Sequence, residues 1–154
     1  MAQTSTTLSG EISHKSDITG TDISFSASGS TYTISSTSTV LTGAGKLAAR
    51  DLVTVTGTTN NNSTFTVKEV VSTTEFTVEE VVTTENSDGS TTFTLDHTGF
   101  VTDKEKGDGY YSQPDGVHTI AYHVGATLND DANIGIKMQG SLATTPTEDD
   151  WFDI

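Results

Sequence analysis

The chain is poor in several residue types, and each shortage excludes a class of protein. It contains no cysteine, which excludes disulfide bonds, thiolate metal sites and a cysteine nucleophile. Only seven lysine and arginine residues stand against 21 aspartate and glutamate residues, and the resulting net charge of -14 argues against sequence-independent binding of nucleic acid. No apolar run could span a bilayer, and the N-terminus lacks the segments of a secretory signal. We therefore expect a protein made in the cytoplasm that does not insert into membranes and is stabilised by packing and assembly.

Hydroxyl side chains are what the chain has in abundance. Serine and threonine make up nearly a third of the 154 residues, whereas hydrophobic residues account for 32%. This balance is typical of thin β-sandwiches and barrels whose outer faces contact water. The acidic charge leaves three interpretations open: a saline working environment, a basic docking partner, or the ordinary acidic surface of a soluble protein.

The clearest structural signal lies between residues 49 and 85. Threonine alternates there with valine or phenylalanine, as a half-buried antiparallel sheet requires, and the pattern predicts three short strands. Val53 and Val55 fall on one face of the first strand. The following run Asn60–Asn62 predicts a turn, because asparagine tolerates the left-handed conformation that tight turns use.

Two glutamates interrupt the apolar pattern of the next two strands. Phe65-Thr-Val-Lys-Glu-Val-Val and Phe76-Thr-Val-Glu-Glu-Val-Val repeat at a spacing of eleven residues, and in each copy a glutamate, Glu69 or Glu80, follows the Phe and Val face. A charged side chain rarely stays inward without a partner. The sequence therefore predicts a β-bulge or a strand end at each glutamate.

Turn and helix signals complete the local pattern. Residues 22–27 and 32–34 predict a hairpin across a Ser-Gly-Ser turn, and Asn86–Ser90 predicts a second hairpin turn that leads into residues 91–96. The good helix formers of Lys46–Arg50 suffice for one turn at most. The predicted fold class is all-β, an antiparallel β-sandwich or small β-barrel modules with almost no helix.

Four regions follow from these patterns. Residues 1–16 read as an N-terminal arm that is disordered alone or ordered against a neighbour, and residues 17–102 as a β-barrel-like module. The polar residues 103–116 predict a linking loop. Residues 117–154 predict a second set of strands, with strands expected at 117–124, at 133–141 and at the aromatic segment 150–154, whose abrupt end suggests an edge strand or an incomplete module.

No catalytic motif stands out. Gly43–Lys46 resembles the end of a phosphate-binding loop, but leucine follows Lys46 and no useful helix follows. The histidines are His14, His97, His118 and His123. The odd separation of the last two places them on opposite strand faces, so we expect surface or partly packed histidines rather than a metal site. We predict no catalytic residue, no cofactor and no enzymatic activity.

Carboxylates and aromatic residues of the second half are the remaining site candidates. Five acidic residues are weak candidates for binding a metal ion, and their oxygen ligands would suit calcium: Asp130, Asp131, Glu148, Asp149 and Asp150. A solvated acidic face is the commoner meaning of such runs. Candidates for interaction are the aromatic residues Tyr110, Tyr111, Trp151 and Phe152, which suit subunit packing or, alternatively, a platform for glycans.

Two parts of the chain resemble modules of bacteriophage virion proteins, particularly those of phages of marine bacteria and cyanobacteria. The first spans about residues 20–85 and carries Ala49-Arg-Asp-Leu-Val-Thr-Val-Thr-Gly57, the asparagine turn, and the two Phe-Thr-Val strands. The second spans residues 105–154 and carries Gly107–Tyr111, Pro114–Ile120 and Met138–Asp153. In similar proteins this last run belongs to a jelly-roll-like sandwich.

The resemblance implies a non-enzymatic virion structural protein. We expect decoration of the phage head by a homo-oligomer, with a trimer favoured, that docks on the major capsid protein or other virion proteins through strand edges and its N-terminal arm. The alternatives are a tail or fibre component, or a carbohydrate-binding module for adsorption to the host.

The saline interpretation of the acidic surface can be tested by thermal unfolding. Salt screens the repulsion between carboxylates, so raising ionic strength from low to marine levels should raise the unfolding temperature. An unchanged or lower midpoint would exclude saline adaptation as the meaning of the charge.

Overall fold

The computed structural model describes Thr7 and residues 13–102, together with residues 138–141, Thr145, Asp150 and residues 152–153. The chain divides into two compact units, 1–109 and 110–154. The predicted linking loop 103–116 lies outside the described residues, so its assignment stays a prediction. The described residues form strands and no α-helix, and all strand pairs are antiparallel, which confirms the predicted all-β class.

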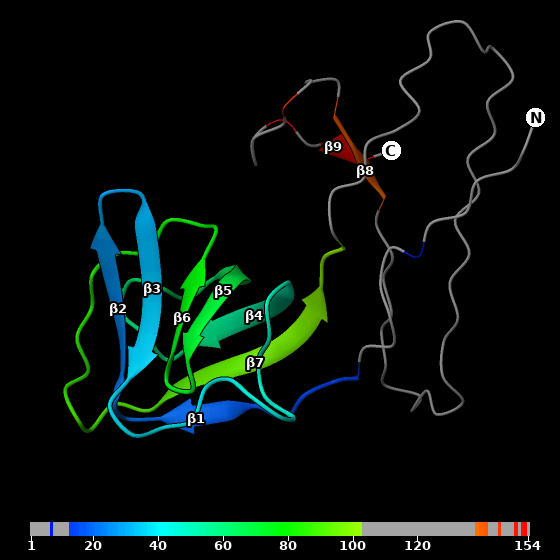
Figure 1. The fold of residues 1–154 in the computed structure, drawn as a ribbon. Helices are drawn as coiled ribbons and strands as arrows, with labels where there is room; N and C mark the ends of the chain where they lie inside the picture. The colour runs from blue at the N-terminus through cyan, green and yellow to red at the C-terminus, as the bar shows by residue number, and fades with distance from the viewer. Residues whose placement is uncertain are drawn as a thin grey trace, which may run out of the picture. The chain divides into compact units, whose positions relative to one another are not determined.

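The first unit is built on one seven-stranded antiparallel sheet (Figure 1). Its strands are β1 (Ile18–Gly20), β2 (Ile23–Ser28), β3 (Thr31–Ser36), β4 (Asp51–Thr56), β5 (Thr64–Ser72), β6 (Glu75–Val78) and β7 (Phe93–Phe100). They lie in the order β1-β7-β4-β5-β6-β3-β2. Only Thr21 and Asp22 separate β1 from β2, although these strands are the two ends of the order. The sheet must therefore curl back on itself, since two residues span less than about 10 Å.

The curled sheet encloses a single core on its inner face. Each of the seven strands contributes at least one buried apolar side chain, and the loops add Leu41, Leu47 and Val82. The strand members are Ile18, Ile23, Phe25, Ile34, Val53, Val55, Phe65, Val67, Phe76, Val78, Phe93 and Leu95. Burial of a side chain of this kind is worth roughly 1.5–3 kcal/mol, so this small set stabilises the unit. The predicted placement of Val53 and Val55 on one face is confirmed.

The predictions for the two glutamates are confirmed. The register of β5 against β6 shifts between Val67 and Glu69, which is the bulge expected there. β6 ends at Val78, ahead of Glu80. The Glu80 carboxylate then accepts hydrogen bonds from the backbone N–H of Thr66 at 2.6 Å and from its hydroxyl at 2.7 Å.

The hairpin of residues 22–34 is confirmed as the pair β2–β3, whereas the hairpin expected around Asn86–Ser90 is wrong. A turn is present, because Asp88 accepts hydrogen bonds from the N–H groups of Ser90 and Thr91. However, β7 pairs with β4 and β1 rather than with the segment that precedes the turn. That segment instead covers the edge of β2, where Phe25 and Glu85 exchange backbone hydrogen bonds of 2.8 and 2.9 Å.

The asparagine turn forms by a different mechanism from the expected one. Among the described residues Arg50 is the only non-glycine residue with a positive φ, so Asn60–Asn62 do not use the left-handed conformation. Gly57 takes it instead, with φ 88°. The asparagines contribute their side chains: Asn62 Oδ1 accepts from the N–H of Thr58, and Asn61 Nδ2 donates to the carbonyl of Thr83.

The second unit is described in part. Its strands β8 (Gln139–Gly140) and β9 (Phe152–Asp153) form an antiparallel pair and lie within the strands expected at 133–141 and 150–154. The Gln139 side-chain amide donates to the Asp153 carboxylate at 3.0 Å. The strand expected at 117–124 lies outside the described residues. No described helix has the length and apolarity needed to cross a membrane.

Replacing Gly57 with alanine should destabilise the first unit. A Cβ at this position would lie 2.5 Å from the backbone oxygen of Thr92, in addition to the left-handed φ. We expect a loss of roughly 2–4 kcal/mol in urea unfolding.

Gly29→Ala is the matched control, because Gly29 has φ 60° but open space around its Cβ position. It should cost about 1–2 kcal/mol from the backbone alone. Equal losses in the two variants would show that the close approach to Thr92 is unimportant.

Candidate functional site

The most unusual group of side chains in the first unit lies where two core-facing rows end in polar residues. Along β4 the inward row is Asp51, Val53 and Val55, and Asp51 is only 3% exposed. Along β7 the inward row runs through Leu95 to His97, which is 4% exposed. A buried carboxylate and a buried imidazole thus replace apolar side chains at one end of the core. Burial of such groups is costly unless they are paired.

Backbone irregularities in both strands place these two side chains. Arg50, with φ 76°, donates its N–H to the carbonyl of Val67, immediately before Asp51. In β7 the register jumps between Leu52 paired with Gly99 and Val53 paired with His97, so one strand carries an extra residue. β-Bulges of this kind redirect side chains and are common beside functional sites.

Lys15 joins the two groups from the segment Ser13–Asp17, which precedes β1. Its ammonium donates to Asp51 Oδ2 in a contact whose side chains are 16% and 4% exposed. Its backbone N–H donates to His97 Nδ1 at 3.3 Å. The N-terminal segment was expected to be disordered alone or ordered against a neighbour. In the described residues 13–16 of that segment, Lys15 contacts the sheet of its own chain, and the prediction for the rest of the arm stays a prediction. We name Lys15, Asp51 and His97 the Lys–Asp–His cluster.

The hydrogen bonds assign the tautomer of His97. Because Nδ1 accepts from Lys15, the proton of the neutral ring is on Nε2. Nε2 lies 3.4 Å from Asp51 Oδ1, close enough for an electrostatic interaction, but it makes no hydrogen bond to a described residue. The ring of His14 meets the His97 ring edge-on, with 5.5 Å between centroids. We expected surface or partly packed histidines, and the burial of His97 corrects that expectation for this residue.

A second acidic pair adjoins the Lys–Asp–His cluster. Burial raises the pKa of Asp96, and a hydrogen bond and the negative charge of Asp17 raise it further. The electrostatic influence of His14 and His97 lowers the pKa of Asp96 and so acts in the opposite direction. Asp96 and Asp17 are therefore linked through a shared proton more readily than two exposed carboxylates would be.

The Lys–Asp–His cluster borders an open depression of about 520 Å³. It is lined by Ser13, His14, Lys15, Ser16, Gly45, Ala48, Ala49 and Asp51. Asp51 is fixed there by an additional bond, since its Oδ2 accepts from the N–H of Ala48 at 2.7 Å. Within the described part of the chain no group of three or more potential ligands could hold a metal ion. What the cluster can do chemically is exchange a proton or an ion-pair partner.

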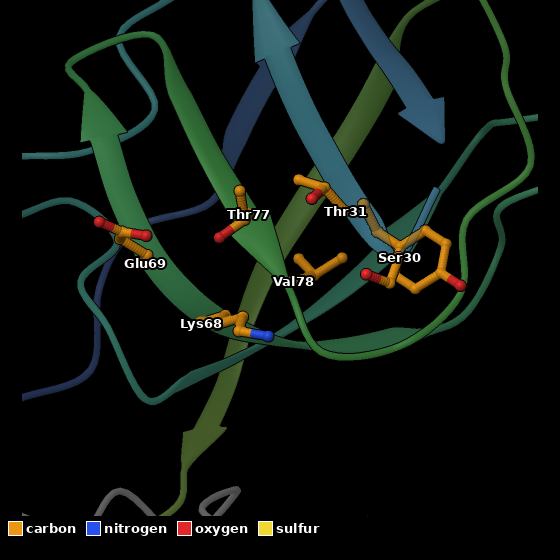
Figure 2. A pocket seen from close by; sticks show the side chains of 7 residues that line it. Ser30, Thr31, Lys68, Glu69, Thr77 and Val78 are labelled. Carbon is orange, nitrogen blue, oxygen red and sulfur yellow. The ribbon is translucent and has the colours of Figure 1, made fainter. Parts of the chain in front are cut away.

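A second, smaller pocket of about 120 Å³ lies on the β3, β5 and β6 side of the sheet. Figure 2 shows Lys68 and Glu69 on β5, Thr77 and Val78 on β6, and Ser30 with Thr31 at the start of β3. The Thr77 hydroxyl has no hydrogen-bond partner in the part of the chain that the structure describes. Sites for small organic ligands usually have volumes of about 300–1,000 Å³, so this pocket is a surface niche.

Other carboxylates of the first unit hold loops in place. Asp22 accepts hydrogen bonds from the Ser36 hydroxyl at 2.6 Å, the Thr39 hydroxyl at 2.6 Å and the Ser38 hydroxyl at 2.8 Å. These bonds hold the pKa of Asp22 far below its usual range. Such a group stabilises the fold above the ordinary aspartate pKa, and the contribution is lost only in strong acid.

Glu85 fastens the asparagine turn to the edge of β2. Its carboxylate accepts from the N–H groups of Thr59 at 2.7 Å and Asn60 at 3.0 Å, and from the Asn61 side chain at 2.9 Å. Burial raises the pKa of Glu85, but these hydrogen bonds outweigh that effect and the net shift is downward. Asp22 and Glu85 therefore hold loops in fixed positions.

Most site residues predicted from the sequence lie outside the described residues. These are Asp130, Asp131, Glu148 and Asp149 among the acidic candidates, and Tyr110, Tyr111 and Trp151 among the aromatic ones. Asp150 is exposed, and Phe152 is 49% exposed on β9. The roles proposed for all of them stay predictions.

Sequence reasoning missed the Lys–Asp–His cluster, although one signal was available. The period of two that puts Phe93 and Leu95 inward also puts His97 inward, and the same period runs from Val55 through Val53 to Asp51. Nothing in the sequence indicates that Lys15, more than 30 positions away, would complete the group.

Comparison of the chain with models of protein families, with curated proteins and with solved structures found no match.

Removing one member of the Lys–Asp–His cluster should be costly. Asp51→Asn leaves the buried Lys15 ammonium without its counter-charge, and we expect a loss of roughly 3–5 kcal/mol in urea unfolding. Lys15→Met should also destabilise, and the double variant should lose less than the sum of the two.

The pair of exposed Lys68 and half-buried Glu79, at 3.5 Å, is the control. Lys68→Met should change the free energy of unfolding by less than about 1 kcal/mol. Strict additivity of Lys15→Met and Asp51→Asn would show that the two side chains do not interact.

Proposed function

We propose that the protein is a non-enzymatic structural component of a bacteriophage virion that decorates the head as a homo-oligomer, with a trimer favoured. The resemblance of residues 20–85 and 105–154 to virion modules supports this proposal, as does the all-β fold. Its partners would be the major capsid protein or other virion proteins, and its location the virion.

One structural observation carries the proposal furthest: the carboxylates of the first unit that have strongly directed hydrogen bonds fix loops to the sheet. Asp22 holds the loop after β3, Glu85 holds the asparagine turn, and Asp88 holds the turn before β7. Ties of this kind make a rigid body with defined loops. A rigid body is what a protein needs if it acts by docking rather than by chemistry, because little freedom is lost on binding.

The fold also narrows the elements available for docking. The edge of β2 is covered by its own chain, since Glu85 exchanges two backbone hydrogen bonds with Phe25 and Ala27 donates to the Thr84 hydroxyl. Docking through this edge would require displacement of that segment. We assign contacts with the capsid to the N-terminal arm and to the strand pair that carries the half-exposed Phe152.

The net charge of -14 favours a basic surface on the partner. Contacts of modest strength would suffice, because copies arranged around a symmetry axis of the head multiply them into avidity.

The proposal is tested by adding the purified chain to phage capsids that lack it and by tracing it in a cryo-EM reconstruction of the native particle. We expect saturable binding to the capsids and density on capsid symmetry axes. A variant without residues 1–12 should bind more weakly, and Phe152→Ala should reduce binding without changing the circular dichroism of the sheet.

Three results would contradict head decoration. Density confined to the tail would move the function to tail assembly or adsorption. Absence from the particle together with a titratable change of tryptophan fluorescence on adding a glycan would favour a carbohydrate-binding module. A monomer that binds no capsid would remove the basis of the proposal.

A further inference from the structure

The segment Ser13–Asp17 is attached to the sheet by bonds that depend on the protonation of one side chain. Three contacts hold it: the Lys15 ammonium on Asp51, the Lys15 N–H on His97 Nδ1, and the His14 ring against the His97 ring. The second contact exists only while Nδ1 carries no proton. An imidazole is the side chain whose charge ordinarily changes between about pH 5 and 8.

We propose that the Lys–Asp–His cluster is a proton-operated latch that holds the segment Ser13–Ser16 on the sheet near neutral pH and releases it in mild acid.

The hydrogen bonds explain why a proton opens the latch. When Nδ1 of His97 takes up a proton from water, it becomes a donor and faces the N–H of Lys15, which is also a donor. The bond between them is lost, and both N–H groups remain in a site where the His97 side chain is only 4% exposed. Buried donors without acceptors are strongly unfavourable. Movement of Lys15 away from the sheet relieves this by admitting water to Nδ1.

The charges also favour replacement of Lys15 by His97 as the cation beside Asp51. In the closed state Asp51 carries one negative charge and Lys15 one positive charge, while His97 is neutral. Protonation of His97 adds a second positive charge beside them, with His14 at 5.5 Å from the same ring. If Lys15 then moves into water, Asp51 keeps one cation, because the His97 Nε2–H already lies 3.4 Å from Asp51 Oδ1. In each state the charge of Asp51 is therefore balanced by one cation. The two states differ in whether that cation is Lys15 or His97.

The other charged groups around His97 set the limit of the movement. The segment contributes Asp17, β7 contributes Asp96, and Arg50 precedes Asp51. Asp96 and Asp17 share a hydrogen bond, and both burial and Asp17 raise the pKa of Asp96. This link therefore becomes stronger rather than weaker in acid. Asp17 therefore stays attached beside β1, and release is confined to the residues before it. Arg50 keeps its charge throughout this pH range.

A spin label on the segment would report the release directly. The chain has no cysteine, so Ser13→Cys provides a single attachment point for a nitroxide at an exposed position. We expect restricted motion at about pH 8 and a several-fold shorter rotational correlation time at about pH 5, the limits of ordinary histidine titration. Circular dichroism of the same samples should show an intact sheet at both values.

Matched variants assign the transition to His97. His97→Asn keeps an acceptor at the δ position but does not titrate, so the label should remain restricted at both pH values. His14→Gln should keep the transition, because His14 donates none of the bonds to Lys15. Lys15→Met removes the ammonium contact and keeps the N–H bond to His97, so the label should be more mobile at about pH 8 than in the unaltered chain.

Three outcomes would overturn the latch: a label whose motion does not change with pH, a transition that persists in His97→Asn, or unfolding of the whole sheet at the acid end. Should His97→Asn fail to fold, the unaltered chain decides the question by NMR. The Lys15 amide proton should shift upfield and lose exchange protection as the pH falls, and an amide that does neither excludes the latch.

Discussion

The structure depends on the closure of one sheet around a small apolar core. Only 32% of the residues are hydrophobic, and the first unit collects its buried members from all seven strands and three loop positions. A flat sheet of this composition would leave its apolar face in water. Curling brings both ends of the strand order together, and the two residues between β1 and β2 leave the sheet no alternative. The remaining features follow from this need to close.

Polar side chains fix the loops of this protein, a role that apolar contacts have in proteins with larger cores. Asp22 and Glu85 accept several hydrogen bonds each from loops made mainly of serine, threonine and asparagine, and Asp88 does the same before β7. Because these acceptors are ionised, each bond is stronger than one between neutral groups. A chain rich in serine and threonine supplies the donors. This explains how loops with little apolar content can be held in defined positions on an acidic protein.

At one end of the core, buried polar side chains take the place of apolar ones. The inward rows of β4 and β7 finish in Asp51 and His97, and neither could remain buried alone. Lys15 supplies the missing charge and covers the end, so the N-terminal segment becomes part of the first unit. The same arrangement that completes the core is also the place where a proton could change it. Stability and responsiveness to pH thus have a common origin in this protein.

The sequence by itself determined the class of fold and much of its local structure. Alternation of Thr with Val or Phe established β4, β5 and β6, and the two misplaced glutamates established the bulge after Val67 and the end of β6, because these features depend on side chains close in sequence. Tertiary structure alone decided what depends on distant partners. The segment before Asn86 lies along β2 rather than forming a hairpin with β7, Gly57 rather than an asparagine takes the left-handed conformation, and Lys15 meets Asp51 and His97. No local pattern encodes these choices, since each is set by which strands close the sheet.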